Sequence, residues 1–522
     1  MIRENNGLKS MKVITKVVLM FMFFAVNVSL MAQKEIEYQS DWGERRPAFP
    51  DDLILKTNVV FRHEGMVMYC DSAVLNKAVN QFSAFGIIDI YVDDTIHLSG
   101  DEVYYDGNTK IAEIMGDRVI MEDGKMTLIT DYLVLERIPN IVKYTTSGVI
   151  YDSTDTLTSR KATYFMNDKT FDFTDSVNIR TKESEVFSDT IHYSTKTHDA
   201  LCYGATTVVQ TTDSTIIYTE KGLYNTQTSY CESYMAGKMT QKGRLMFADT
   251  LFYNSKLRKG EAFSNIKIYD SVNQTNAFGN YVNMTTIDTL SYLILTDSSL
   301  VKQFENEDTL YFHADTLVYV SDTMNNALDL YAYKHAKIFR NDFQGAAEFA
   351  HYHIEDSLLM MLERPVLWNE ESQMTADTLI MLFSGRKIHQ LRLYPNALVV
   401  QDADTLSDDR FNQIYGRHLT AYFDGGKIKE AEIEGNAQSI YYMWEEKKGK
   451  AARLIGINIG NSSKMKMYFE KSKMKSLVGI DKPEYKLDDE ERVPVEERKL
   501  KGFIWSAADR PLIPTDIFKH RQ

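Results

Sequence analysis

Hydrophobic and polar residues alternate with a period of two along most of the chain. The pattern is clearest between Gly86 and Gly116, in three runs: Ile87–Val92, Ile96–Tyr105 and Lys110–Met115. Alternation of this kind turns one face of a strand toward a core and the other toward solvent. Polar turns separate the runs, so the stretch predicts three β-strand segments.

The middle run contains a change of phase. The inward position shifts between Leu98 and Val103, around Ser99-Gly100-Asp101. This shift predicts a bulge or corner at which the strand passes from one sheet to another. Aspartate followed by threonine is common at the equivalent places, and such short side chains bond nearby backbone amides at corners.

The unit recurs about every 30 residues. With Asp101 as reference, the equivalent positions are Asp71, Asp101, Asp131, Arg160, Asp189, Glu220, Asp249, Asn280, Asp315, Glu348, Asp377 and His418. Eight of these twelve positions are followed four residues later by tyrosine, namely Tyr105, Tyr164, Tyr193, Tyr224, Tyr253, Tyr319, Tyr352 and Tyr422. The segment His418–Gly435 is echoed by Lys464–Gly479, so the array extends to about residue 485.

The repeats predict an all-β fold. One unit cannot bury its own apolar face, whereas stacked units share a continuous core. We therefore expect an elongated β-jellyroll or solenoid-like stack of ~30-residue repeats, with three strands per repeat divided between two facing sheets. The residues expected to point into the trough between these sheets are Ile96, Leu98, Val103, Leu251, Tyr253, Leu317 and Tyr319.

The two ends of the chain differ from the array. Residues 1–32 read as a signal peptide, because Lys12 and Lys16 precede the apolar run Val17–Met31, with cleavage expected after Ala32. An uncleaved membrane anchor is the alternative, and either Met1 or Met11 can be the start. Residues 33–54 form a polar lead-in, and residues 55–485 form the array.

Residues 486–522 form a charged linker followed by a docking tail. Apolar side chains crowd this terminus: Phe503, Trp505, Leu512, Ile513, Ile517 and Phe518. They are expected to dock either on the last repeat or on a partner.

Composition excludes some classes of function. The net charge is −14, which argues against nucleic acid as a partner because phosphate binding needs clustered lysine and arginine.

Three cysteines, Cys70, Cys202 and Cys231, are too few for a disulfide scaffold. Cys202 and Cys231 lie about one repeat apart, and both a disulfide and buried free thiols remain open.

Motifs of catalysis are missing from the sequence. It has no nucleophile elbow, P-loop, dinucleotide fingerprint or His-Glu-x-x-His. His351 and His353 share a strand face without an evident third metal ligand. The aspartates could form glycosidase pairs or a calcium ladder, but corner hydrogen bonds already account for them. The recurring tyrosines fit either a structural ladder or a sugar-binding strip. We expect no enzyme activity, no cofactor and no metal.

Short motifs recur at the repeat period, including Asn58-Val59-Val60, Ala248–Tyr253, Ala314–Tyr319 and Gly435-Asn436-Ala437. In these the chain resembles the OstA-like family of lipopolysaccharide transport, over about residues 55–485. The resemblance implies a β-jellyroll in a Gram-negative periplasm that holds lipopolysaccharide acyl chains between its sheets. It also implies end-to-end β-stacking with other envelope transport proteins.

The sequence is compatible with three functions. The first is a periplasmic carrier of lipopolysaccharide or a related lipid that contributes to outer-membrane assembly, with association to that membrane left open. Given the charge of −14, its grip should come from the apolar trough. The second is a structural or adhesive β-solenoid with a closed, dry core. The third is a β-helix enzyme that acts on polysaccharide.

Overall fold

The computed structural model describes residues 34–93, 95–305, 308–385, 387–403, 409–445, 452–470 and 473–519. The predicted signal peptide, residues 1–32, lies outside them. The described residues form forty β-strands and four short 3-10 helices. No helix among them has the length and apolar character needed to cross a membrane. The chain divides into two compact units, residues 1–175 and 176–522, which are taken in turn.

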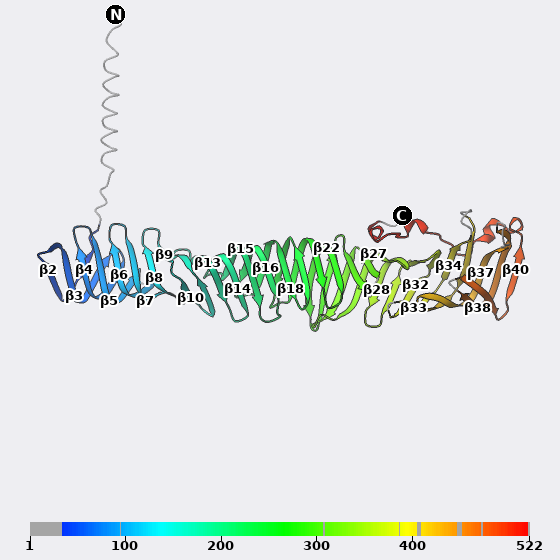
Figure 1. Cartoon of the computed structure of the whole chain (residues 1–522), viewed down its shortest axis with the longest axis horizontal. Helices are drawn as coiled ribbons and strands as arrows, with labels where there is room; N and C mark the ends of the chain where they lie inside the picture. Colours follow the sequence, from blue (N-terminus) through cyan, green and yellow to red (C-terminus); the bar gives the residue numbers. More distant parts are fainter. Residues whose placement is uncertain are drawn as a thin grey trace, which may run out of the picture. The chain divides into compact units, whose positions relative to one another are not determined.

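Unit 1 is a meander of long antiparallel strands joined by tight hairpins (Figure 1). Its full-length strands are β3 (Phe49–His63), β4 (Met66–Asn76), β5 (Gln81–Val92), β6 (Ile96–Asp106), β7 (Ile111–Asp123) and β8 (Met126–Glu136). The next two strands of the meander are each split in two: β9 (Ile141–Tyr144) with β10 (Gly148–Asp152), and β11 (Asp155–Ser159) with β12 (Lys161–Phe165). Within the predicted lead-in, β1 (Glu37–Gln39) and β2 (Trp42–Arg46) pair with β3.

Each long strand bends near its middle. The pairing of β6 with β7 shifts register between Ser99 and Glu102, and the pairings of the neighbouring strands shift at equivalent places. Leu98 and Val103, on either side of the bend, are both buried. The predicted corner is confirmed, because only a turn of the strand brings positions of opposite parity to one core.

The bends divide the strands into two facing layers. We call layer A the half-strands that meet in hairpins such as His63–Met66, and layer B those that meet in hairpins such as Asn76–Gln81. A 30-residue repeat holds two bent strands and so gives two half-strands to each layer. The expectation of three strands per repeat is therefore wrong, since one bent strand reads as two separate runs. Each repeat advances the stack by two strand spacings, about 10 Å.

Aspartates stabilise the corners as predicted. The backbone N–H of Ile87 donates to Asp71 at 3.0 Å, and that of Asp117 donates to Asp101 at 3.1 Å. Gly86 has a φ of +97°, and a Cβ there would lie 2.3 Å from the Asp71 carboxylate. The corner thus needs glycine for both its backbone conformation and its space.

Unit 2 repeats this pattern after β13 (Thr170–Arg180), which contains the boundary between the units. Its strands are β14 (Ser184–Ser194), β15 (Asp199–Gln210), β16 (Ile216–Asn225), β17 (Tyr230–Met235), β18 (Gly237–Gln241), β19 (Arg244–Ala248), β20 (Thr250–Asn254), β21 (Lys259–Asp270), β22 (Thr275–Ile287), β23 (Leu290–Thr296), β24 (Leu300–Glu305), β25 (Asp308–His313), β26 (Thr316–Asp322), β27 (Ala327–Arg340), β28 (Phe343–His353), β29 (Leu358–Leu362), β30 (Val366–Asn369), β31 (Ser372–Thr375), β32 (Thr378–Ser384), β33 (Lys387–Tyr394), β34 (Ala397–Asp402), β35 (Phe411–Gly416), β36 (His418–Asp424), β37 (Lys427–Glu445), β38 (Arg453–Glu470), β39 (Lys473–Ile480) and β40 (Glu484–Asp488).

The strand pairs described in both units are antiparallel, for example β14 with β15 and β37 with β38. A β-helix stacks parallel strands. The β-helix architecture assumed by the third hypothesis is therefore wrong.

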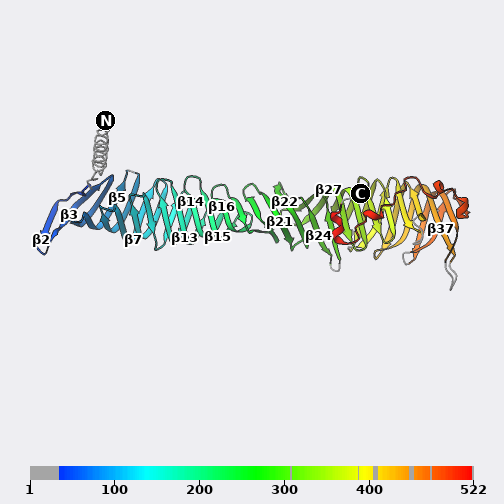
Figure 2. The same ribbon diagram turned by 90° about the horizontal axis from the view of Figure 1, so that it is seen from above.

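The last stretch of unit 2 folds back over the outer face of its own layer A. This strap, residues 489–519, contains η1 (Glu490–Arg492), η2 (Val495–Arg498), η3 (Ala507–Asp509) and η4 (Pro514–Phe518). Figure 2 shows it in red over strands that precede it by many rungs, and η4 contacts β25 and β27. The tail thus docks on its own chain, and it reaches back from the last repeat to strands as early as β25.

The three cysteines are buried free thiols. Cys202 on β15 and Cys231 on β17 are separated by β16, which pairs with both strands. Two strand spacings exceed the reach of a disulfide. Burial raises the pKa of the Cys202 thiol to about 12.

Candidate functional site

The candidate site is the apolar seam between layers A and B. Among the residues predicted to face it, Leu98 and Leu317 are 0% exposed, and the largest exposed fraction is 5%. Three of the seven line the seam of unit 1 (Ile96, Leu98 and Val103) and four line that of unit 2 (Leu251, Tyr253, Leu317 and Tyr319). Their contact with lipid stays a prediction.

The seam is closed at these positions. A side chain with no exposed surface has no room beside it for a water molecule, and therefore none for an acyl chain. A lipid can enter only if the two layers move apart. The edges that hold the layers together therefore decide how the seam works.

Two different edges bound the seam. At one edge, each strand bends from one layer into the other, so the backbone itself connects the layers. At the other edge, which we call the turn edge, hairpins of layer A lie against hairpins of layer B. The bridges found there are side-chain contacts that recur at fixed spacings.

The recurring tyrosines form the first set of bridges. Tyr105 and Tyr164 of layer B reach His63 and Asp123 of layer A in unit 1, at 2.6 and 2.7 Å. In unit 2, Tyr224 and Tyr253 donate to Ser184 and Asp213, each at 2.5 Å. The partner precedes the tyrosine by 40 to 42 residues in every case.

These rings are buried, so they form a structural ladder and not a surface strip for sugars. Burial raises the pKa of Tyr105, Tyr164 and Tyr253, which keeps their hydroxyls protonated as donors. The Nε2 of His63 lies 2.9 Å from the carbonyl oxygen of Lys34 and donates to it, while the Tyr105 hydroxyl meets Nδ1 on the other side of the ring.

Other members of the predicted ladder differ. The buried Tyr319 hydroxyl has no hydrogen-bond partner among the described residues. The Tyr193 hydroxyl lies 3.2 Å from His198 within its own hairpin. Tyr422 is 38% exposed, because the corner falls at Arg417, whose N–H donates to Gly435, and not at His418. The inward residue four places after this corner is Ala421, so the assignment of Tyr422 to the ladder is wrong by one position.

Basic side chains on layer B turns form a second set of bridges. Lys110 binds Glu64, and Lys169 binds Asp123 at 2.5 Å, both across 46 residues. Leu135 occupies a ladder position but has no hydroxyl group. Next to it, Arg137 donates across the edge to Asp93 at 3.1 Å, a residue 44 positions earlier in the sequence. Unit 1 therefore has a cation bridge where the tyrosine ladder is interrupted.

In unit 2 the tyrosine bridge is missing at Met284 and the cation bridge is missing at the neighbouring turn of Arg258, and we call this place the bridge gap. The ladder position is Met284, and 41 residues earlier stands Gly243. Arg258 occupies the turn position equivalent to Lys110, but Thr212 stands 46 residues before it in place of an acid. Thr286, the equivalent of Arg137, bonds Ser291 of its own layer at 3.2 Å.

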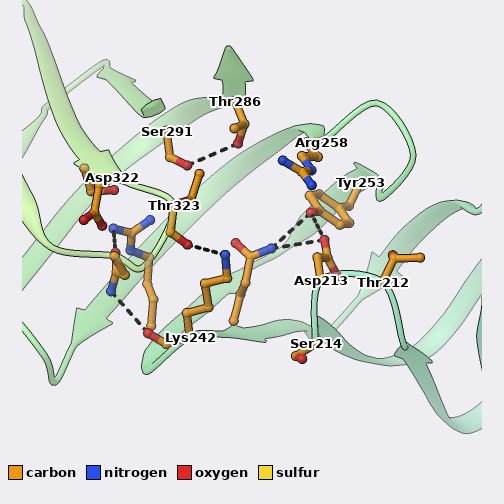
Figure 3. Close-up of a pocket in the computed structure, with 14 residues that line it drawn as sticks. Thr212, Asp213, Ser214, Lys242, Tyr253, Arg258, Thr286, Ser291, Asp322 and Thr323 are labelled. Carbon is orange, nitrogen blue, oxygen red and sulfur yellow. Dashed lines mark hydrogen bonds between the residues drawn. The ribbon is translucent and has the colours of Figure 1, made fainter. Parts of the chain in front are cut away.

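A polar cavity of about 200 Å³ occupies the bridge gap (Figure 3). Its lining is rich in hydroxyl, amide and charged groups: Thr212, Asp213, Ser214, Gln241, Lys242, Arg244, Tyr253, Arg258, Thr286, Ser291, Ser321, Asp322, Thr323 and Asn325. Beyond it the edge closes again, because Asn325 binds Asp270 at 3.1 Å and Arg244 binds both. No sequence motif indicates this cavity, because its lining depends on which hairpins meet across the edge.

Three glutamines hold the strap, and the sequence analysis missed them. Gln413 donates to the carbonyl of Arg498 and accepts from the N–H of Leu500, both at 2.8 Å. Gln373 repeats the arrangement with Ile504 and Ser506, both at 2.7 Å. Each amide thus pairs with the strap backbone as a neighbouring strand would.

The third glutamine, Gln344, accepts from the side chain of Arg510 at 2.7 Å. Each of the three stands four residues before a corner of layer A, at Glu348, Asp377 and Arg417. Their recurrence at this outward position was a signal present in the sequence.

Apolar contacts fix the strap between these hydrogen bonds. Phe503 and Trp505 pack on Phe411 with ring centroids 5.2 and 5.1 Å apart. Val493 packs with Tyr442, and Ile517 packs with Phe339, on the outer face of layer A. Both faces of layer A are buried here.

His351 and His353 have ordinary roles on their strand. His351 lies 2.7 Å from Asp329, and His353 lies 4.0 Å from the same carboxylate. The described residues contain no group of three or more His, Cys, Asp or Glu that could hold a metal ion.

The fold and the seam define a class: antiparallel two-layered β-stacks with an apolar interior. Within this class, residues 35–189 match the family model described as OstA-like protein, and over these residues the chain is OstA-like. A solved structure of LptH, described as the LptA homologous periplasmic component of the lipopolysaccharide transport device from Pseudomonas aeruginosa, is also similar. It shares 12% identity with a TM-score of 0.20, over 23% of this chain and 82% of LptH. No curated protein matches the sequence.

Proposed function

We propose that this chain is a periplasmic carrier of lipopolysaccharide or a closely related lipid and contributes to outer-membrane assembly. The acyl chains lie in the seam between layers A and B, and transport needs neither catalysis nor a cofactor. The OstA-like match over residues 35–189 supports the class of cargo. Other envelope transport proteins are the proposed partners, through end-to-end β-stacking.

One observation carries the proposal: the apolar seam is bounded along its turn edge by side-chain bridges. Each such bridge contributes about 1 kcal/mol to the free energy of holding the layers together, and each can break without the others. Burial of acyl chains stabilises by about 25 cal/mol per Å² of apolar surface, which offsets the loss of several bridges. Entry of lipid therefore requires local separation of layer B from layer A.

Photo-crosslinking in living cells tests this proposal. Tyr105 points into the seam and its neighbour Tyr104 is 37% exposed, so the pair provides an inward site and an outward control. A photoreactive phenylalanine derivative at Tyr105 should capture lipopolysaccharide, and the same residue at Tyr104 should capture much less. Equal capture at both sites, or capture at neither, would contradict transport through the seam.

A structural or adhesive role is the second candidate. The closed packing of Leu98, Leu251 and Leu317, each 0% exposed, favours it. A purely structural stack predicts no lipid after purification from the periplasm under mild conditions. Mass spectrometry of the purified full-length chain distinguishes the two, because a carrier should retain bound lipid.

A further inference from the structure

We propose that the bridge gap is a binding site for the phosphorylated saccharide head group of an amphipathic lipid, whose acyl chains enter the seam beside Met284. This inference rests on the proposed function and names where on unit 2 the lipid is recognised. The net charge of −14 makes a local basic site necessary for such a ligand.

Among the described residues beside Met284, both recurring types of bridge are missing from the turn edge. Leu135 in unit 1 also breaks the tyrosine ladder, but Arg137 bridges to Asp93 beside it. At Met284 the equivalent residue is Thr286, which stays within layer B by bonding Ser291. The described turn edge of unit 2 therefore lacks both recurring types of bridge at Met284, and Lys242 of layer A instead reaches the carbonyl of Thr323 in layer B.

Arg258 carries a positive charge that the described part of the protein leaves unpaired. Lys110, its equivalent in unit 1, is neutralised by Glu64. Arg258 faces Thr212 at that spacing, is exposed, and has no hydrogen-bond or ion-pair partner for its side chain among the described residues. Figure 3 shows it beside Tyr253 on the wall of the cavity. Its guanidinium is thus available for an anionic ligand, and phosphate suits its forked donors.

The remaining lining of the cavity suits a phosphorylated sugar. Lys242, which also binds the carbonyl of Thr323, adds a second cation on the same rim. Asp213 already accepts from Tyr253 and Gln241, and Asp322 accepts from Asn326 and from the N–H of Met324 at 2.9 Å. Both carboxylates are thus engaged within the protein, while the hydroxyls of Thr212 and Ser214 line the cavity as partners for sugar hydroxyls.

The core next to the bridge gap is rich in methionine. Met239, Met246 and Met284 are buried in this part of unit 2. Methionine side chains rearrange readily around an incoming apolar group. A Cβ on Gly260 would lie 2.7 Å from the Cε of Met284, so this glycine provides the space that Met284 occupies. Met284 stands on the same strand, β22, as Thr286 of the cavity lining, so an adaptable part of the core neighbours the polar cavity.

Binding of defined ligands to the full-length chain tests the site. The probes are a diphosphorylated disaccharide lipid of the lipid A type, its dephosphorylated form, and inorganic phosphate. Arg258→Ala removes the free cation, and Thr212→Glu supplies the acid that Glu64 supplies to Lys110. Each variant should weaken binding of the phosphorylated lipid about tenfold, as expected for loss of a charge-assisted hydrogen bond. Binding of the dephosphorylated lipid should be unchanged in Arg258→Ala, which adds no bridge across the edge.

Arg180→Ala is the matched control, because it removes an exposed cation of unit 2 that is already paired with Glu185 of its own layer and bridges nothing across the edge. It should leave binding of both lipids unchanged, and circular dichroism should show all three variants folded. If both gap variants bind the phosphorylated lipid like the wild type, the head-group site is overturned. If inorganic phosphate alone binds as tightly as the lipid, the site takes a free anion and the inference also fails. If the wild type binds neither lipid, the proposed function itself fails.

Discussion

Single hydroxyl groups hold the layers together at the turn edge, and Tyr164 is the clearest case. Its hydroxyl donates to Asp123, whose side chain is only 8% exposed. Tyr164→Phe leaves that carboxylate short of one donor, so we expect the free energy of unfolding to fall by about 1–3 kcal/mol. Urea unfolding of full-length variants measures this. Tyr151→Phe, at a residue that is 48% exposed, is the control and should change stability little.

The bridging tyrosines also predict a dependence on alkaline pH. Burial raises the pKa of Tyr105, Tyr164 and Tyr253 above the value near 10 of an unfolded tyrosine. Because the folded-state pKa is raised, this stability is fully present below pH ~10 and is lost as the pH rises toward the folded-state pKa. Tyrosinate absorbance of these rings should therefore appear together with loss of the β-sheet circular dichroism signal. Gradual ionisation in a chain that stays folded would contradict their buried, bridging position.

At the scale of elements, the strap depends on glutamine amides that act as substitutes for a neighbouring strand. Gln373 is 1% exposed and satisfies both the carbonyl of Ile504 and the N–H of Ser506. Gln373→Ala leaves these two backbone groups without their partner, and we expect a local loss of about 2 kcal/mol. Hydrogen exchange should accelerate at residues 503–506 and stay unchanged in unit 1.

Gln401 provides a matched control for this variant. It is a half-buried glutamine on the neighbouring strand β34. Gln401→Ala should leave exchange in the strap as it is in the wild type. Equal acceleration in both variants would mean that the strap is held by its apolar contacts alone.

The sequence was informative for those elements whose signal is local. Alternation of period two, the phase change at Ser99-Gly100-Asp101 and the tyrosine period gave the strands, the corners and the repeated core. The number of strands per repeat was misjudged because a bend such as that in β6 leaves the same pattern as a turn between two strands. The bridges could not be predicted, since spacings such as Lys110 to Glu64 have meaning only once the facing hairpins are known.

The strands beneath the strap carry a sequence pattern that differs from alternation. Val366–Trp368 and Leu398–Val400 are apolar at consecutive positions, which breaks the alternation seen in Gly86–Gly116. Consecutive apolar residues in a strand indicate that both of its faces are covered. Together with the recurring Gln344, Gln373 and Gln413, these runs mark the outer face of layer A on which the strap lies.

At the scale of the whole molecule, the two units differ in how far apart their contacts lie in the sequence. Hairpin stacks join mainly neighbouring strands, so their stability is nearly a sum over repeats. The strap changes this in unit 2: Arg510 contacts Gln344 across 166 residues, and Lys337 binds the carbonyl of Lys519 across 182. Ile517 also packs with Leu300 of β24, and Val493 packs with Ile457 of β38. The strap thus ties the rungs from β24 to β38 to one segment, so this part of unit 2 should unfold as one cooperative block.

Removal of the strap tests this cooperativity. A chain that ends after Asp488 loses the cover over Phe339 and Phe411, which are 4% and 6% exposed in the intact chain. We expect its unit 2 to unfold at lower urea concentration and over a broader range, with exchange spreading along the rungs, because the long-range contacts are gone. Unit 1, which makes none of these contacts, should keep the same exchange profile, and this provides an internal control. A single sharp transition of unchanged width would show that the rungs are coupled through the seam itself, and that the strap only covers them.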